Sequence, residues 1–166
     1  MPEPTARSSQ YAIDFEAAQQ DFIKLVESLT DEQWGRVGKN FPQRINEEDE
    51  RRPVGVIAHH VAVSGPYIME RIQLMAEGKP LPPPRDFREV NAEHAAEHAN
   101  VGRDEVVKML RETQPRLAEA VRAIPDDQLD QTRETPAGPM SVAMRLERVL
   151  IGHIKGHQGS IEAATS

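Results

Sequence analysis

The segment Leu150-Ile151-Gly152-His153-Ile154-Lys155-Gly156-His157 carries two histidines four residues apart. On an α-helix this spacing puts both rings on one face, about one turn from each other. Apolar residues recur at helical spacing around the pair: Leu146, Val149, Leu150, Ile154 and Ile161. The two rings therefore point into an apolar face, where a buried polar group needs a partner. That partner is either a hydrogen-bonding group or a metal ion, for which HxxxH is a common arrangement.

Length, charge and composition limit the classes of protein to be considered. The chain has 166 residues, which suits a single domain over 1–166 with a flexible lead-in at 1–8. Its net charge of −7 argues against nucleic acid and anionic membrane as partners, because both require clustered Lys and Arg. The lack of cysteine excludes disulfides and thiolate zinc sites. No apolar run is long enough to span a membrane and no signal-peptide pattern is present, so we expect a cytoplasmic, bacterial-style protein.

Helical periodicity runs through most of the chain. Aromatic residues make up only 4%, which favours helices with an aliphatic core over a sheet. We expect four long helices: from a cap at Ser8 or Ser9 to about Leu29, from Pro53 to Gly78, from Asn91 to Ile124, and from Ser141 to about Ala163. Interruptions or bends are expected at Gly65-Pro66, Gly102 and Pro115. The stretches 35–50, 79–87 and 126–140 are expected to be loops or linkers, and we expect no strand.

These elements predict an all-α protein with the architecture of a four-helix bundle. The connection 79–87 is rich in proline and long enough to cross the length of a bundle, so the third helix is free to run parallel to the second. Two adjacent histidines lie near the start of the second helix, about 100° apart around its axis. Counting round the helix puts His60 beside Val56 and Ile57, in the interior, and His59 on the polar side, in solvent.

Four short motifs occur in a fixed order along the chain: the V-x-x-[IL]-x-x-H-[VL] pattern of Val54 to Val61, the late HxxxH of His153 and His157, the Leu29-to-Trp34 ending of the first helix, and Asn91-Ala92. Together they resemble the DinB/YfiT-like family of metalloenzymes. The resemblance covers nearly the whole chain. It implies an up-down-down-up bundle with a divalent metal bound by His60, His153 and His157 at one end. It also implies that a homodimer is possible and that a low-molecular-weight thiol, such as mycothiol or bacillithiol, is a candidate cosubstrate.

Three imidazole ligands leave a coordination position open, which is the catalytic rather than the structural pattern. All-nitrogen ligation suits Zn, Ni, Fe or Cu. We therefore expect a metal-dependent enzyme that acts on a small molecule by thiol transfer, isomerisation or hydrolysis; no catalytic acid or base is identified. The alternatives are a non-catalytic, stress-linked binding or dimerisation module that keeps a metal, and a metal-free bundle whose histidines serve packing. Some thiol-using relatives carry glutamate at the first position of the late motif, and this chain departs from them with His153.

Other candidate residues are interpreted more simply. His94 and His98 form a second pair four residues apart, which we expect to be exposed or at the rim of a pocket rather than a metal site. Asn91 is interpreted as a helix cap. Trp34 is expected to cover the core or to form a wall of the site. The acidic run 47–50 is expected to be a solvated loop.

Overall fold

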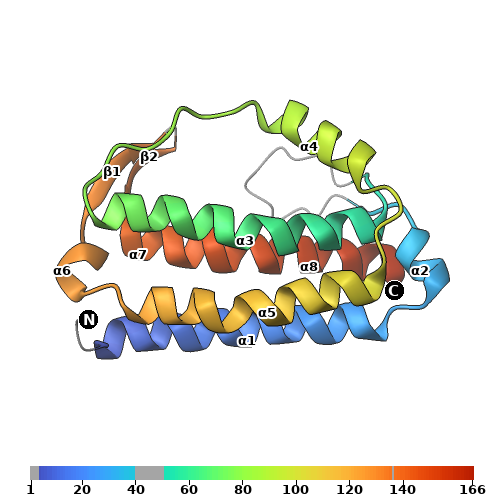
Figure 1. Ribbon diagram of the computed structural model, residues 1–166, viewed down its shortest axis with the longest axis horizontal. Helices are drawn as coiled ribbons and strands as arrows, with labels where there is room; N and C mark the ends of the chain where they lie inside the picture. The colour runs from blue at the N-terminus through green and yellow to red at the C-terminus, as the bar shows by residue number, and fades with distance from the viewer. Residues whose placement is uncertain (1–3, 40–50, 136) are drawn as a thin grey trace.

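The structure is a computed structural model that describes residues 4–39, 51–135 and 137–166. Its frame consists of α1 (Ala6–Ser28), α3 (Val54–Ala76), α5 (Arg103–Arg122) and a C-terminal helical run formed by α7 (Val142–Arg145), η1 (Leu146–Ile151) and α8 (Gly152–Thr165). In Figure 1, α1 and the C-terminal run point one way while α3 and α5 point the other way. The predicted four-helix bundle with up-down-down-up topology is therefore confirmed.

Shorter elements connect the helices of the bundle. They are α2 (Asp31–Gly35), α4 (Phe87–Glu97), α6 (Asp126–Leu129) and a hairpin of β1 (Thr132–Thr135) and β2 (Gly138–Ser141). The two strands pair antiparallel, from Thr132 opposite Ser141 to Thr135 opposite Gly138. Figure 1 shows α4 above α3, outside the bundle, and the hairpin near the end of the bundle where α1 begins.

The core is aliphatic, as the composition predicts, with two phenylalanines from α1. Its largest side chains that are fully buried include Phe15, Phe22, Ile57, Ile72, Leu110, Leu146 and Ile161. One buried polar side chain ties α1 to α5, because Gln19 Nε2 donates to the carbonyl oxygen of Leu110 at 2.9 Å. A buried amide without a hydrogen-bond partner would lower the stability of the fold, so this bond favours one axial position of α1 relative to α5.

Side chains cap several helices, and one predicted cap is wrong. A capping box of Thr30 and Gln33 is present at α2, and Ser141 caps α7. The cap of α1 is Thr5, not Ser8 or Ser9: Ser8 is the third helical residue and completes a capping box with Thr5. Gly78 ends α3 with a φ of 70°, a left-handed conformation that glycine adopts without steric cost.

Several expectations from the sequence are wrong. The stretch 126–140 is not only a linker, since it contains α6, β1 and part of β2, and the expectation that the chain has no strand is therefore wrong. The third helical region does not start at Asn91: α4 starts after its cap Asp86, and Asn91 lies inside α4 rather than capping it. The interruption predicted at Gly102 is confirmed, since Gly102 separates α4 from α5. The last helix is interrupted by the π-helical turn η1. Pro66 and Pro115, by contrast, lie within α3 and α5, which continue past them.

Two further observations concern the rest of the chain. The acidic run 47–50 lies outside the described residues. Among the helices that the structure describes, none combines the length and apolar character needed to cross a membrane.

Candidate metal centre

The three histidines predicted as ligands converge at one end of the bundle. His60 comes from the second turn of α3, while His153 and His157 come from the first two turns of α8. His153 Nε2 lies 3.1 Å from His60 Nε2 and 3.0 Å from His157 Nε2. His157 is fully buried, His60 is 9% exposed and His153 is half-buried. Because α3 and α8 are antiparallel, the start of one helix and the late part of the chain meet here (Figure 1).

The arrangement of the ring nitrogens fits a cation better than hydrogen bonds alone. A neutral imidazole nitrogen carries either one proton or one lone pair, directed along one line in the ring plane. His153 Nε2 faces two other Nε2 atoms, and it can form a well-aligned hydrogen bond to only one of them at a time. Imidazole binds Zn²⁺ and similar ions at about 2.0–2.1 Å, so ligands of one ion lie roughly 3 Å apart. The observed separations of 3.0 and 3.1 Å match that requirement.

The π-helical turn η1 sets the phase of the two late histidines. A π turn contains more residues than an α turn, so it rotates the following helix face relative to the preceding one. Leu146, Leu150 and Ile151 in η1 are buried, whereas Val149 is only half-buried. His157 then lies on the buried face of α8 with Ile154 and Ile161. Turns of this kind are frequent at functional sites, because they redirect side chains without ending the helix.

A second cluster lies beside the first and contains the remaining histidines. His59 Nδ1 lies 2.8 Å from His94 Nε2, and the His59 ring stacks on the His98 ring with centroids 4.0 Å apart. His59 is only 3% exposed, so the expectation that it points into solvent is wrong. The helical count was correct about its direction, but α4 covers that face of α3. His94 and His98 are half-buried against His59 rather than an exposed pair.

Burial keeps two rings of the second cluster, those of His59 and His94, uncharged. Desolvation lowers the pKa of His94 to about 4, and the neighbouring His59, His98 and Arg52 act in the same direction. Desolvation is also the main cause that lowers the pKa of His59. Both rings are therefore neutral near pH 7, which is the form that binds metals.

Trp34 lies at the same end of the bundle as the two histidine clusters, and its described contacts are with other residues. Its indole Nε1 donates to the carbonyl oxygen of Val101 at 3.0 Å, so it links α2 to the connection between α4 and α5. The ring lies against Gly55, where an added Cβ would come within 2.6 Å of the indole. Gln33 Nε2 donates to the carbonyl oxygen of Thr165, which joins α2 to the end of α8. Trp34 therefore packs against the start of α3, one turn before His59.

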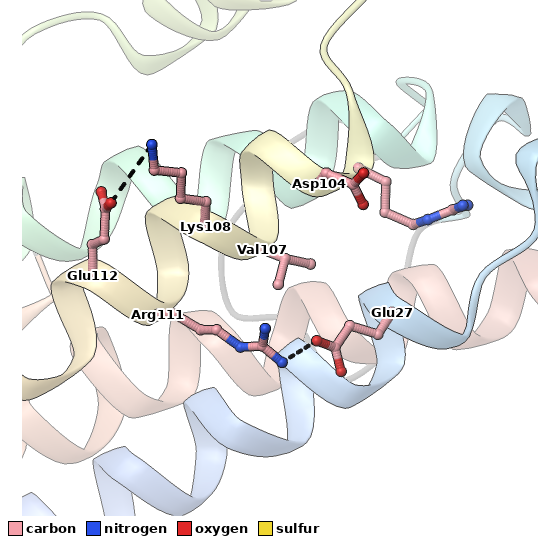
Figure 2. Close-up of a pocket in the computed structure, with 7 residues that line it drawn as sticks. Glu27, Asp104, Val107, Lys108, Arg111 and Glu112 are labelled. Atoms are coloured by element: carbon pink, nitrogen blue, oxygen red, sulfur yellow. Dashed lines mark hydrogen bonds and ion pairs between the residues drawn. The ribbon is translucent and has the colours of Figure 1, made fainter.

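A groove on the surface of the bundle lies away from the histidines. It has a volume of about 590 Å³ and runs between α1 and α5, lined by Glu27, Arg103, Asp104, Val107, Lys108, Arg111 and Glu112. Figure 2 shows its charges paired with each other, Arg111 with Glu27 and Lys108 with Glu112. It contains no histidine, and it offers paired surface charges rather than convergent reactive groups. We therefore place the candidate site at the histidines.

The fold and the histidines together define a class of protein: a four-helix bundle with two parallel middle helices and a cluster of imidazoles at one end. The family model of the DinB superfamily matches residues 14–161, so the chain belongs to the DinB superfamily. Among solved structures, the chain is similar to YfiT from Bacillus subtilis, a probable metal-dependent hydrolase with an unusual four-helix bundle topology. The two share 19% sequence identity with a TM-score of 0.70, over 95% of this chain and 85% of that one. No curated protein matches the chain.

Proposed function

We propose that this protein is a metal-dependent enzyme that acts on a small molecule by thiol transfer, isomerisation or hydrolysis. The observation that carries the proposal is the convergence of three imidazole nitrogens, from two antiparallel helices, on one point. Membership of the DinB superfamily and the likeness in fold to YfiT, a probable metal-dependent hydrolase, support it. His60, His153 and His157 would hold the ion. Its identity would be Zn, Ni, Fe or Cu, all of which accept nitrogen ligands.

The chain prepares these ligands through their packing. His60 directs Nε2 toward the cluster, and its Nδ1 lies 3.5 Å from the hydroxyl of Ser64, one turn further along α3. A partner on the second ring nitrogen holds a metal-binding imidazole in one orientation and one tautomer. His157 is held by its burial and His153 by the first turn of α8. When bound, a divalent ion with an open position lowers the pKa of a bound water, activates a thiolate or polarises a carbonyl group.

The assignment of the ligands is tested by metal content. His60→Ala, His153→Ala and His157→Ala are purified without an affinity tag, loaded with Zn²⁺ and analysed for metal per chain after removal of free ions. Each variant should bind Zn²⁺ about 100-fold more weakly, since even partners of the ligands contribute 10- to 100-fold. Lys155→Ala is the matched control, because Lys155 is exposed and lies between the two late histidines on α8. Unchanged affinity in all three histidine variants would contradict the assignment.

The enzymatic part is tested separately, with the wild-type chain loaded with metal. Panels of small thiols with electrophiles, and of simple esters and amides, should reveal a turnover that disappears on chelation and returns with metal. Turnover that survives both chelation and the His153→Ala change would exclude this site as its source. Bound metal without turnover in any panel would instead favour the non-catalytic binding or dimerisation module. Light scattering on the same protein tests the expected homodimer.

A further inference from the structure

All six histidines of the chain belong to one of two groups of three. The first group is the proposed enzymatic site. The second consists of His59 on α3, His94 on α4 and His98 at the end of α4. One nitrogen of each ring in this group lies within 4.8 Å of the others. A chain that places no histidine outside these two groups uses the residue type for a purpose other than general surface polarity.

The second group has the same donor set as the first and a comparable geometry. Ring centroids are 5.0 Å apart for His59 and His94, 4.0 Å for His59 and His98, and 4.8 Å for His94 and His98. In the first group the corresponding separations are 4.3–5.0 Å. The two groups are also neighbours, because the rings of His60 and His94 meet edge to face with centroids 5.8 Å apart.

A buried nitrogen without a partner marks the second group. Among the residues that the structure describes, Nδ1 of His94 is buried and has no hydrogen-bond partner. Leaving such a group unsatisfied costs about 1–3 kcal/mol. An ion bound at Nδ1 would supply this partner, while the contact with His59 is made by the other ring nitrogen of His94, Nε2.

The charges around the second group are mixed. The positive charge of Arg52 acts on His94 and opposes a cation there. Two carboxylates act in the other direction: Glu97 Oε2 lies 4.0 Å from His98 Nε2, and Glu105 exerts a negative potential on His59. Late transition metals gain their affinity mainly from nitrogen ligation, so three imidazole ligands are a stronger influence than one nearby guanidinium.

We propose that His59, His94 and His98 form a second site for a divalent transition-metal ion, adjacent to the first. The ion would join α4 to α3. None of the described residues of α4 belongs to the buried core, so the helix has little apolar contact to hold it in place. The proposal depends on this group alone and does not require the first site to be catalytic.

The test is Zn²⁺ stoichiometry, measured by equilibrium dialysis on untagged full-length protein. The variants are His98→Ala and His153→Ala, one from each group, and each serves as the control for the other. His98 is half-exposed, so its removal is not expected to disturb folding, which circular dichroism checks. The wild type should bind two ions, and each variant one.

The outcomes separate the two proposals. One ion in the wild type that is lost in His98→Ala but kept in His153→Ala would support the second site and contradict the first. One ion that is kept in His98→Ala, or one that is weakened by both changes, would overturn a separate second site, and so would no binding at all. Hydrogen exchange gives a second readout: Zn²⁺ should slow exchange in α4 at least 10-fold in the wild type and in His153→Ala, but not in His98→Ala. Equal slowing in all three would contradict the proposal.

Discussion

Each of the two groups of histidines consists of three imidazole side chains, but different helices hold them. The first group lies between α3 and α8, two long helices whose inner faces form the core. The second shares α3 but takes His94 and His98 from α4, a helix of 11 residues that lies outside the bundle. His157 in the first group is fully buried, whereas His94 and His98 are half-buried. The donor atoms of the two groups are therefore chemically alike. The helices that hold the first group are packed in the core, whereas one of the helices that hold the second group is not.

This difference predicts different behaviour toward ligands. Groups held by a packed core lose little conformational freedom on binding, so more of the interaction energy appears as affinity. Groups on a surface helix must be ordered when the ligand binds. We expect the first group to bind metal more tightly, and the second to respond to metal with a local change in order.

The largest expected effect is the thermal stability conferred by metal. A ligand that binds only the folded state at about 1,000 times its Kd stabilises that state by about 4 kcal/mol. Saturating Zn²⁺ should raise the melting temperature of the wild type and of His98→Ala, and much less that of His153→Ala. Differential scanning calorimetry measures this. An equal loss in the two variants would mean that α4 unfolds together with the bundle and that the supports do not differ.

The next effect concerns Gly55, on the helix that both groups share. In Gly55→Ala the new Cβ would lie 2.6 Å from the Trp34 indole, whose Nε1 is held by Val101, so the ring or the helix must move. We expect a loss of about 1–3 kcal/mol in the free energy of unfolding, the usual cost of overpacking. Urea denaturation measures it. Gly35→Ala is the control, because nothing lies within 4 Å of a Cβ there and Ala is the better helix former. An equal loss in both variants would contradict the clash with Trp34 as the cause.

A smaller effect separates the supports directly. Asp86 caps α4 by accepting a hydrogen bond from the backbone N–H of Arg88 at 2.9 Å, and Ser141 caps α7 in the same way from Met144. Loss of a cap costs about 0.5–2 kcal/mol. In Asp86→Ala we expect faster hydrogen exchange confined to α4, with the midpoint of global unfolding unchanged. In Ser141→Ala the midpoint itself should fall, since the C-terminal run is part of the bundle. The reverse pattern would contradict the comparison.

The smallest effect is expected far from both groups. Arg7 pairs with Asp130 at 2.9 Å at the opposite end of the bundle, and this hydrogen-bonded charge lowers the pKa of the Asp130 carboxyl. Both side chains are exposed, so solvent screens the pair. Arg7→Ala should leave the melting temperature and the binding of Zn²⁺ within experimental error. A clear change in Zn²⁺ binding would reveal coupling along the whole length of the bundle.

The candidate site was predictable where side chains lie on long amphipathic helices. His153 and His157 could be placed in the interior because the apolar residues around them define one face. His60 could be placed in the same way beside Val56 and Ile57. Their meeting depended on the direction of the helices, which the resemblance to DinB/YfiT-like proteins supplied. His59 could not be placed correctly, because counting round a helix assumes that its polar side faces water.

The wrong predictions about local structure also arose because the pattern of residues along the chain was too weak or ambiguous. The strands at 132–135 and 138–141 are four residues each, too short and too polar to show an alternating pattern. The π turn at Leu146–Ile151 could not be predicted, because apolar residues three or four apart fit an α-helix with or without one extra residue in a turn. The predicted cap of α1 was Ser8 or Ser9, but Thr5 is the cap. Thr and Ser are both favoured at this position, so residue type alone does not distinguish them.

The amino-acid sequence by itself determined the helical class, the end of α3 at Gly78, the start of the last helix at Ser141, and the inward direction of His60, His153 and His157. These features depend on neighbours within about one turn of the chain, whose geometry is the same in any helical protein. Only the tertiary structure decided that α4 covers His59 and brings His94 and His98 to it. A short polar helix has no apolar face to specify where it lies, so its position follows from the segments at its two ends and from the surface that they span.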